Sequence, residues 1–315
     1  MLALIIWIFI FISCLFILFK SSNYFINSAE NIGKFLKLPP FIIGVVIVGI
    51  GTSLPELVSS IFAVIKGSSS IVPGIVIGSN ITNIFLVFGL SAILVKTTKI
   101  DYEIIDDLPI LAAASFLLML TISDGVFNLF DAILCLTFLV IHLVYILKKD
   151  IKYSQFKKEE KELFKSKLEI RHLIILIISS CLIYFSAQYL IESVIKISTI
   201  LNIGRDLIAV TILSLGTSLP ELFVTIVAAI KKKPEIAVGN IMGSNIFNSL
   251  AVMGIPALFG SIIVPTSVIT FALPIMLIAT FLFFFVVFDK KITRMHGLLL
   301  ILFYIFFIVK SFGIM

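Results

Sequence analysis

An internal repeat constrains the fold of this chain more than any other feature of its sequence. Residues 41–93 align without a gap on residues 206–258, an offset of 165 residues, with 24 identities in 53 positions. The heptapeptide GTSLPEL occurs in both copies, at residues 51–57 and 216–222. Apolar sequence inflates chance matches among Ile, Val and Ala, but it does not place Thr, Ser, Pro, Glu and Asn in register. The chain is therefore expected to fold as two similar units.

The composition places both units in a membrane. Hydrophobic residues make up 60% of the chain and charged residues 13%, with a mean hydropathy of +1.21, whereas soluble domains are roughly 25% charged. Apolar runs of about 20 residues are long enough to span a bilayer as helices. We expect ten spans, at about 2–19, 40–65, 71–95, 105–123, 127–147, 171–190, 206–230, 236–259, 265–288 and 295–313. The polar stretch SSNYFINSAENIG after the first run is compatible with an extension of that helix.

The number of spans sets the relation between the two units. Each half has five spans, an odd number, so the second half must enter the membrane from the opposite side. We therefore predict an all-α integral membrane fold in which ten transmembrane helices form two inverted five-helix repeats. The repeats comprise residues 1–150 and 166–315, and a cytoplasmic linker, residues 151–165, joins them.

The distribution of Lys and Arg predicts the orientation. With the N-terminus outside, 20 basic residues fall on the inner side and 4 on the outer side. Basic residues are enriched on the cytoplasmic side of membrane proteins, so both termini are expected outside a cell membrane and the basic segment 148–171 inside. Anionic lipid accounts for the net charge of +6, and no nucleic-acid partner is expected.

Four of the expected helices carry two polar side chains four residues apart, which places each pair on one helical face. The pairs are Thr52/Glu56 and Ser79/Asn83 in the first half and Thr217/Glu221 and Ser244/Asn248 in the second. At an inverted-repeat interface these faces are expected to meet near the membrane midplane.

The repeated prolines predict irregular backbone at the same depth. Pro55 and Pro220 remove a backbone donor, so each helix is expected to kink or break there. Leu54 and Leu219, which precede the prolines, are expected to leave the α-helical conformation. Because lipid cannot satisfy a freed carbonyl, such backbone must face protein or a polar cavity.

The repeated glutamates predict the charge of the ligand. An intramembrane carboxylate is costly unless something compensates it, and neither repeat core has a basic side chain to pair with Glu56 or Glu221. A bound cation is the simplest compensation. The available groups are carboxylate, hydroxyl, amide and backbone oxygens, which suit Ca²⁺ or Na⁺ and, with stricter geometry, Mg²⁺. Cys and His form no cluster for a softer metal.

These residues resemble the sodium/calcium exchanger branch of the cation/calcium antiporter superfamily. The resemblance rests on GTSLPE with GSNITN in the first half, residues 51–56 and 78–83, and GTSLPE with GSNIFN in the second, residues 216–221 and 243–248. It implies a Na⁺/Ca²⁺ antiporter that works by alternating access, is not an enzyme, needs no cofactor and functions as a monomer. The first and sixth spans would slide to alternate the access.

The resemblance also implies roles for individual residues. Glu56 and Glu221 would be carboxylates shared by Ca²⁺ and Na⁺, and the backbone carbonyls of Thr52 and Thr217 would complete the Ca²⁺ site. One flanking Na⁺ site would use Ser53, Ser79 and the Gly49 carbonyl. The other flanking site would use Ser218, Ser244 and the Ser214 carbonyl, while Asn83 and Asn248 would line the centre.

Two departures and several alternatives remain open. Asn248 stands where some prokaryotic relatives have Asp, so the centre has two carboxylates rather than three. Ile75 occupies the position equivalent to Asn240, so the two halves differ there. A proton-coupled or K⁺-dependent exchanger of the same fold is the main alternative. A channel is disfavoured because the chain carries its own internal two-fold, and a membrane enzyme because no hydrolase or protease motif appears.

Overall fold

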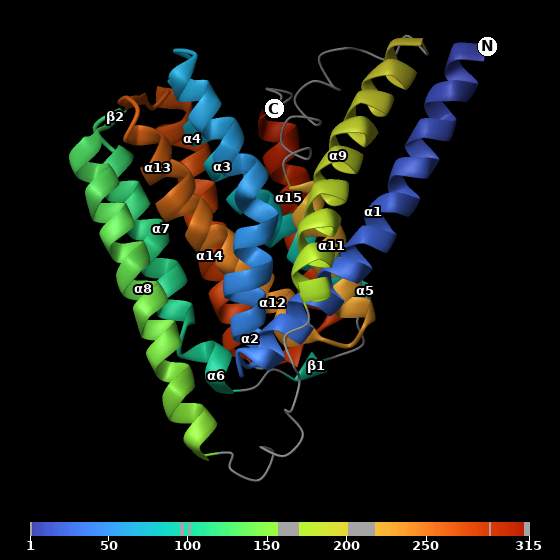
Figure 1. Cartoon of the computed structure of the whole chain (residues 1–315). Coiled ribbons are helices and arrows are strands. Elements are labelled where there is room, and N and C mark those ends of the chain that lie inside the picture. Colours follow the sequence, from blue (N-terminus) through green and yellow to red (C-terminus); the bar gives the residue numbers. More distant parts are fainter. Residues whose placement is uncertain are drawn as a thin grey trace.

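The computed structural model describes residues 2–94, 98–99, 102–156, 170–200, 218–289 and 291–311, and these residues are almost entirely helical. Figure 1 shows the long helices running alongside one another as a bundle. The longer helical segments are α1 Leu2–Phe35, α2–η1–α3 Pro40–Ile65, η2–α4–η3–α5 Ser69–Leu94, α7 Leu108–Ile122, α8 Leu129–Phe156, α9 Ile170–Ile200, α11 Leu219–Ile230, α12–η5–α13 Pro234–Ala257, η6–α14 Val268–Phe288 and α15 Arg294–Ser311. A short helix, α6 (Tyr102–Ile105), precedes α7.

The helices confirm a multi-pass membrane architecture. Eight of those in the described residues are long and apolar enough to cross a membrane, and α7 and α11 are apolar but shorter. Part of the run that contains α11, residues 206–217, lies outside the described residues. The count of ten spans therefore stays a prediction. The first helix, α1, is 34 residues long and includes the whole SSNYFINSAENIG stretch.

Two short β ribbons connect the two halves of the chain. Strand β1 (Thr98–Lys99) pairs antiparallel with β4 (Lys291–Ile292), and β2 (Val126–Phe127) pairs with β3 (Ile262–Ile263). Each ribbon thus takes one strand from each half. In Figure 1 the two ribbons lie at opposite ends of the bundle, β2 near the top and β1 near the bottom.

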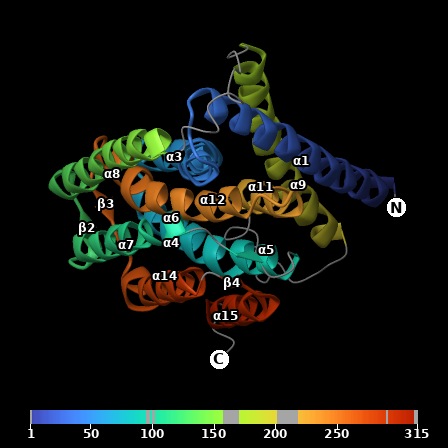
Figure 2. The same cartoon turned by 90° about the horizontal axis from the view of Figure 1, so that it is seen from below.

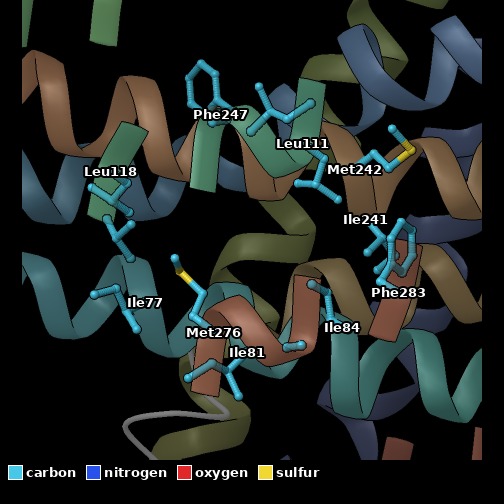
Figure 3. Close-up of a cluster of buried hydrophobic side chains, with 14 of the residues drawn as sticks. Ile77, Ile81, Ile84, Leu111, Leu118, Ile241, Met242, Phe247, Met276 and Phe283 are labelled. Atoms are coloured by element: carbon cyan, nitrogen blue, oxygen red, sulfur yellow. The ribbon is translucent and has the colours of Figure 1, made fainter. Parts of the chain in front are cut away.

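The interior is divided into two hydrophobic clusters. The larger one joins α4, α7, α12 and α14, and Figure 3 shows Ile81, Leu118, Ile241 and Phe283 among its members. The smaller one groups side chains of α1, α9 and α11 with parts of η1 and α12. Figure 2 shows α1 and α9 crossing each other at one side of the remaining helices. The α1–α9 pair therefore contacts the rest of the bundle through this smaller cluster, on η1, α11 and α12.

The π-helical segment η1 (Ile43–Gly49) crosses α12 (Pro234–Phe247) at backbone contact. A Cβ atom on Gly44 would lie 2.6 Å from the Ile236 carbonyl oxygen, and one on Gly239 would lie 2.5 Å from the Phe41 carbonyl oxygen. A Cβ on Gly243 would overlap the Val45 carbonyl. Only glycine allows this approach, as at small-residue helix crossings in membranes.

A methyl group at this crossing is expected to destabilise the protein. Gly243→Ala forces the two backbones apart, at a cost on the order of 1–3 kcal/mol for overpacking. Thermal unfolding in detergent should show a lower melting temperature than wild type. Gly260→Ala is the matched control, because its Cβ would meet only Val64 Cγ1 at 3.4 Å. Equal melting temperatures for the two variants would contradict the close crossing.

Candidate ion-binding site

The first GTSLPEL segment lies in α3 (Ile50–Ile65), and its polar side chains face the protein interior. Thr52, Ser53 and Glu56 are buried, while Leu54 is 46% exposed. Pro55 lies inside α3 and the helix continues through it. The helix does not break here, and the expected departure of Leu54 from α-helical geometry is wrong. Neighbouring protein groups can accommodate one missing backbone hydrogen bond in a membrane helix.

The second segment is described from residue 218 onward. There α11 begins at Leu219 with Pro220 in its first turn, where the missing N–H needs no helical partner. Leu219 is helical, so the expectation for this residue is also wrong. Ser218 and Glu221 are both buried. Two expected ligands lie outside the described residues: Ser214 and Thr217.

π-Helical backbone occurs at equivalent positions in the two halves. The segment η3 (Asn83–Phe88) begins at Asn83, and η5 (Asn248–Val252) begins at Asn248, which is 165 residues later. A third π-helical segment, η1, leads into Thr52. π-Turns are rare and concentrate at functional sites. The irregular backbone expected at Pro55 is not found there: η1 ends at Gly49, and η3 and η5 lie on other helices.

Glu56 and Glu221 are the only two carboxylates placed in the repeated motifs, and both are almost completely buried, with exposed fractions of 1% and 0%. Ser53 Oγ donates a hydrogen bond to Glu221 Oε1 over 3.2 Å. Within the described part of the chain, both oxygens of Glu56 and the second oxygen of Glu221 have no hydrogen-bond partner. The two carboxylates are close enough to repel each other. This arrangement calls for positive charge.

A cluster of neutral oxygens lies at the crossing of η1 and α12. The Thr52 hydroxyl lies 3.3 Å from the Gly49 carbonyl oxygen, 3.2 Å from Asn240 Oδ1 and 3.3 Å from Ser244 Oγ. Ser244 Oγ donates to the same Gly49 carbonyl over 3.2 Å. The Asn240 amide nitrogen donates to Thr225 Oγ1 over 2.8 Å.

Amide side chains link the two halves further along α4 (Val72–Thr82) and α12. The Asn80 amide nitrogen donates to the Asn245 carbonyl over 3.3 Å, and the Asn245 amide nitrogen donates to the Asn80 carbonyl over 3.4 Å. Asn83 Nδ2 also donates to Asn245 Oδ1 over 3.1 Å. The side chain of Asn248 is buried without a hydrogen-bond partner among the described residues.

The structure changes the grouping of the expected ligands. Ser244 lies beside the Gly49 carbonyl, across the interface between the halves, whereas the resemblance grouped it with Ser214. Ser53 lies beside Glu221 of the other half. Ser79 is buried in α4. Each group of oxygens that the structure places together therefore draws on both halves.

Sequence reasoning noted Asn240 only as a point of difference between the halves, and it missed Thr225. The same 165-residue offset carries a signal for both. It pairs Asn240 with Ile75 and Thr225 with Ser60. A hydroxyl therefore occurs at the Thr225 position in both halves, whereas the amide of Asn240 occurs in the second half alone.

The oxygen donors at this site suit a hard cation. The described residues contain no group of three or more His, Cys, Asp or Glu side chains that could hold a metal ion. Coordination here would instead combine two carboxylates with hydroxyl, amide and backbone oxygens. Na⁺ and Ca²⁺ accept such ligands, and Ca²⁺ tolerates the flexible geometry that mixed ligands give.

Comparisons with known proteins agree with this chemistry. The family model described as sodium/calcium exchanger protein matches residues 6–148 and 171–313. The sodium/calcium exchanger MaX1 of Methanosarcina acetivorans is 32% identical, over 94% of this chain and 96% of that protein. The putative antiporter CaxA of Alkalimonas amylolytica is 32% identical, over 80% of this chain and 79% of that protein.

Solved structures extend the likeness to the fold. The sodium-calcium exchanger NCX_Mj, soaked with zero Na⁺ and Ca²⁺, superposes with a TM-score of 0.83 at 27% identity, over 98% of this chain and 99% of that one. The same exchanger soaked with 2.5 mM Na⁺ and 0.1 mM Ca²⁺ gives 0.79, over 96% and 97%. With its family model matched over most of its length, this multi-pass membrane protein belongs to the sodium/calcium exchanger family.

Proposed function

We propose that this protein is a secondary antiporter that exchanges Na⁺ for Ca²⁺ at a site centred on Glu56 and Glu221. The observation that carries the proposal is the pair of buried carboxylates, which have neutral oxygens around them and no ion pair in the described residues. Membership of the exchanger family supports the same ions. Two carboxylates balance the charge of one Ca²⁺ or two Na⁺, so the two cargoes compete for one charge-neutral site.

The proposed ligands follow from contacts and from the repeat. Glu56 and Glu221 serve both ions, and Ca²⁺ also uses the backbone carbonyls of Thr52 and Thr217. Asn83 and Asn248 line the centre. The flanking Na⁺ sites form across the halves, and their groups are the Gly49 carbonyl with Ser53 and Ser244 on one side and, by the same offset, the Ser214 carbonyl with Ser218 and Ser79 on the other.

Several observations support two inverted repeats with this site between them. The two ranges matched by the family model are displaced by 165 residues, the offset of the internal repeat. Equivalent residues contact each other, as for Asn80 with Asn245 and for Ser115 Oγ with Thr280 Oγ1 at 3.3 Å. The two β ribbons at opposite ends exchange strands between the halves. Contacts between equivalent residues are expected on a two-fold axis.

Alternating access requires one part of the protein to move against another. The α1–α9 pair contacts the other helices through the smaller hydrophobic cluster and not through the larger one, so we assign it the moving role and the main core the fixed one. A small cleft lies between these parts against Thr52, lined also by Pro55, Ser180, Tyr184 and Pro220. We assign this cleft to the path by which ions reach the site, with both chain termini outside and the linker between α8 and α9 in the cytoplasm.

Neutralising either central carboxylate is expected to abolish exchange. Glu56→Gln or Glu221→Gln keeps the shape of the side chain but removes the charge that balances the cargo. Sodium-driven ⁴⁵Ca²⁺ uptake into proteoliposomes should fall at least about a hundredfold, while gel filtration shows folded protein. Glu235→Gln, at the start of α12, is a control that should retain wild-type uptake. Near wild-type uptake in either central variant would exclude this site.

Changing one gradient at a time tests the coupling ion. We expect ⁴⁵Ca²⁺ uptake when Na⁺ is inside the liposomes, and none when the Na⁺ gradient is replaced by a pH gradient, because the chain belongs to the sodium/calcium exchanger family. Addition of K⁺ at constant Na⁺ should leave the rate unchanged. Uptake driven by the pH gradient alone, or an absolute need for K⁺, would replace Na⁺/Ca²⁺ exchange with the corresponding alternative.

A further inference from the structure

Asn240 provides a hydrogen-bond acceptor in a fixed position for the Thr52 hydroxyl. Asn240 is fully buried, and its amide nitrogen is fixed by the 2.8 Å hydrogen bond to Thr225 Oγ1. The amide carbonyl oxygen consequently faces Thr52 Oγ1 at 3.2 Å. The Gly49 carbonyl is a second acceptor, 3.3 Å from Thr52 Oγ1, and it also accepts a hydrogen bond from Ser244.

The direction of this proton matters for cation binding. A hydroxyl carries one proton and two lone pairs, so it can ligate a cation only when its proton points elsewhere. An amide oxygen is an acceptor alone and takes that proton without competing for the lone pairs. Asn240 therefore prepares Thr52 Oγ1 to face a cation, as outer partners of metal ligands commonly do.

The other half of the protein lacks this device. The offset of 165 residues places Ile75 opposite Asn240 and Ser60 opposite Thr225. Ile75 offers no acceptor, and the buried Ser60 Oγ has no hydrogen-bond partner among the described residues. The arrangement of hydroxyl, amide and second hydroxyl is thus present once among the described residues.

We propose that Asn240, anchored by Thr225, is a positioning residue that turns the Thr52 hydroxyl into a Na⁺ ligand, so that the two flanking sites bind Na⁺ unequally. This inference rests on the proposed Na⁺/Ca²⁺ exchange. It adds the Thr52 hydroxyl to the Na⁺ ligands. Ca²⁺ uses the backbone carbonyl of Thr52 instead, so Ca²⁺ binding is expected to depend less on Asn240 than Na⁺ binding does.

The test compares the half-saturating concentrations of the two ions in proteoliposome exchange. Asn240→Leu is expected to raise the value for Na⁺ roughly tenfold, the size typical for loss of an outer partner, with a smaller effect on that for Ca²⁺. Thr225→Val should raise the Na⁺ value in the same direction. Thr225→Ser, which keeps the acceptor, should restore wild-type behaviour. Thr225→Val is close in shape to the native residue, so a folding defect is not expected to mask the result.

Ser60→Ala is the matched control from the other half and should leave both values unchanged. An unshifted Na⁺ value in folded Asn240→Leu protein, or identical behaviour of Thr225→Val and Thr225→Ser, would overturn the inference. An equal shift in Ser60→Ala would overturn it as well. A wild-type protein that shows no Na⁺-driven uptake would instead overturn the proposed function.

A different region carries a second inference. The end of α1 is tied to the loop between α11 and α12 by a polar network, here named the α1 latch. Lys233 Nζ forms an ion pair with Glu30, and Lys34 Nζ lies 3.0 Å from the same carboxylate. Lys231 Nζ donates to Asn27 Oδ1 over 2.6 Å and to the Asn23 carbonyl over 3.3 Å.

The equivalent contact in the other half is not made. The repeat offset pairs Lys231 with Lys66 and Asn27 with Glu192, which would give an ion pair between α9 and the loop after α3. Both Lys66 and Glu192 are exposed, and neither makes an ion pair within the described part of the chain.

Helix packing also differs between the two halves. The helix α1 packs extensively along α11, whereas its equivalent, α9, meets α3 at few positions. The cleft lined by Thr52 and Tyr184 is bordered by all four of these helices, since Phe25 of α1 and Pro220 of α11 line it as well. Two interfaces that the repeat makes equivalent therefore differ: α1 is closely packed on α11 and latched, whereas α9 is loosely packed on α3.

We infer that the two latches alternate. In this structure the α1 latch is closed, and in the opposite access state Lys66 pairs with Glu192 while Lys231 and Lys233 release α1. This rests on the proposed alternating access. Partly exposed ion pairs are individually weak, so the latches bias the balance between the two states by a few-fold rather than locking either one.

Disulfide trapping tests this pair of latches independently of transport. In a background with Cys14, Cys135 and Cys181 changed to Ala, the pair Lys66→Cys and Glu192→Cys should cross-link under mild oxidation. Adding Lys231→Ala and Lys233→Ala should speed this cross-link several-fold, because the competing state loses its latch. Lys232→Asn, which removes an exposed charge from the same loop, should leave the rate unchanged.

Two results would overturn the latch inference. One is the absence of the Lys66→Cys and Glu192→Cys cross-link in protein that gel filtration shows to be folded. The other is a cross-linking rate that Lys232→Asn raises as much as the double alanine variant does. Because cross-linking is read on gels, both outcomes are separate from failure of the proposed Na⁺/Ca²⁺ exchange.

Discussion

Two carboxylates buried in an apolar helix bundle without an ion-pair partner in the described residues are the constraint on which the rest of this structure depends. Glu56 and Glu221 have almost no exposed surface, and three of their four oxygens lack a hydrogen-bond partner in the described residues. Burial of such charge is unfavourable unless a counter-charge is present. The proposed cation cargo provides this counter-charge, and it also explains why hydroxyl and amide oxygens gather at the same place.

The second determinant of the proposed site is the close approach of the η1 and α12 backbones. Glycines at the crossing of η1 and α12 bring the two helices into direct contact, and this contact places the Gly49 carbonyl beside Ser244. A larger residue at Gly239 or Gly243 would move these oxygens apart. Oxygen ligands for a small cation must lie within a few ångströms of one another, so the crossing sets the geometry of the proposed site as well as stabilising the fold.

The third feature is that the two halves of the chain are similar but not identical in their contacts. Asn80 and Asn245 bond each other reciprocally, as expected for equivalent residues on a two-fold axis. Elsewhere the halves differ, because α1 packs extensively along α11 while α9 meets α3 at few of the described positions. An antiporter with inverted repeats needs two states of nearly equal free energy. Two similar halves meet this requirement if one is closely packed while the other is loosely packed, because exchanging the two arrangements gives a second state of similar free energy.

The sequence by itself determined the membrane class and the family, and it predicted the two glutamates of the proposed site, because hydropathy and a repeated motif such as GTSLPEL are properties of the chain alone. It predicted wrongly that Leu54 would leave the helix, since proline rules do not include the neighbours that support a membrane helix. Only the tertiary structure decided that Ser244 joins Gly49 across the halves and that Asn240 is anchored by Thr225. Those partners lie on different helices, and which of them meet depends on how closely and at what register the helices cross.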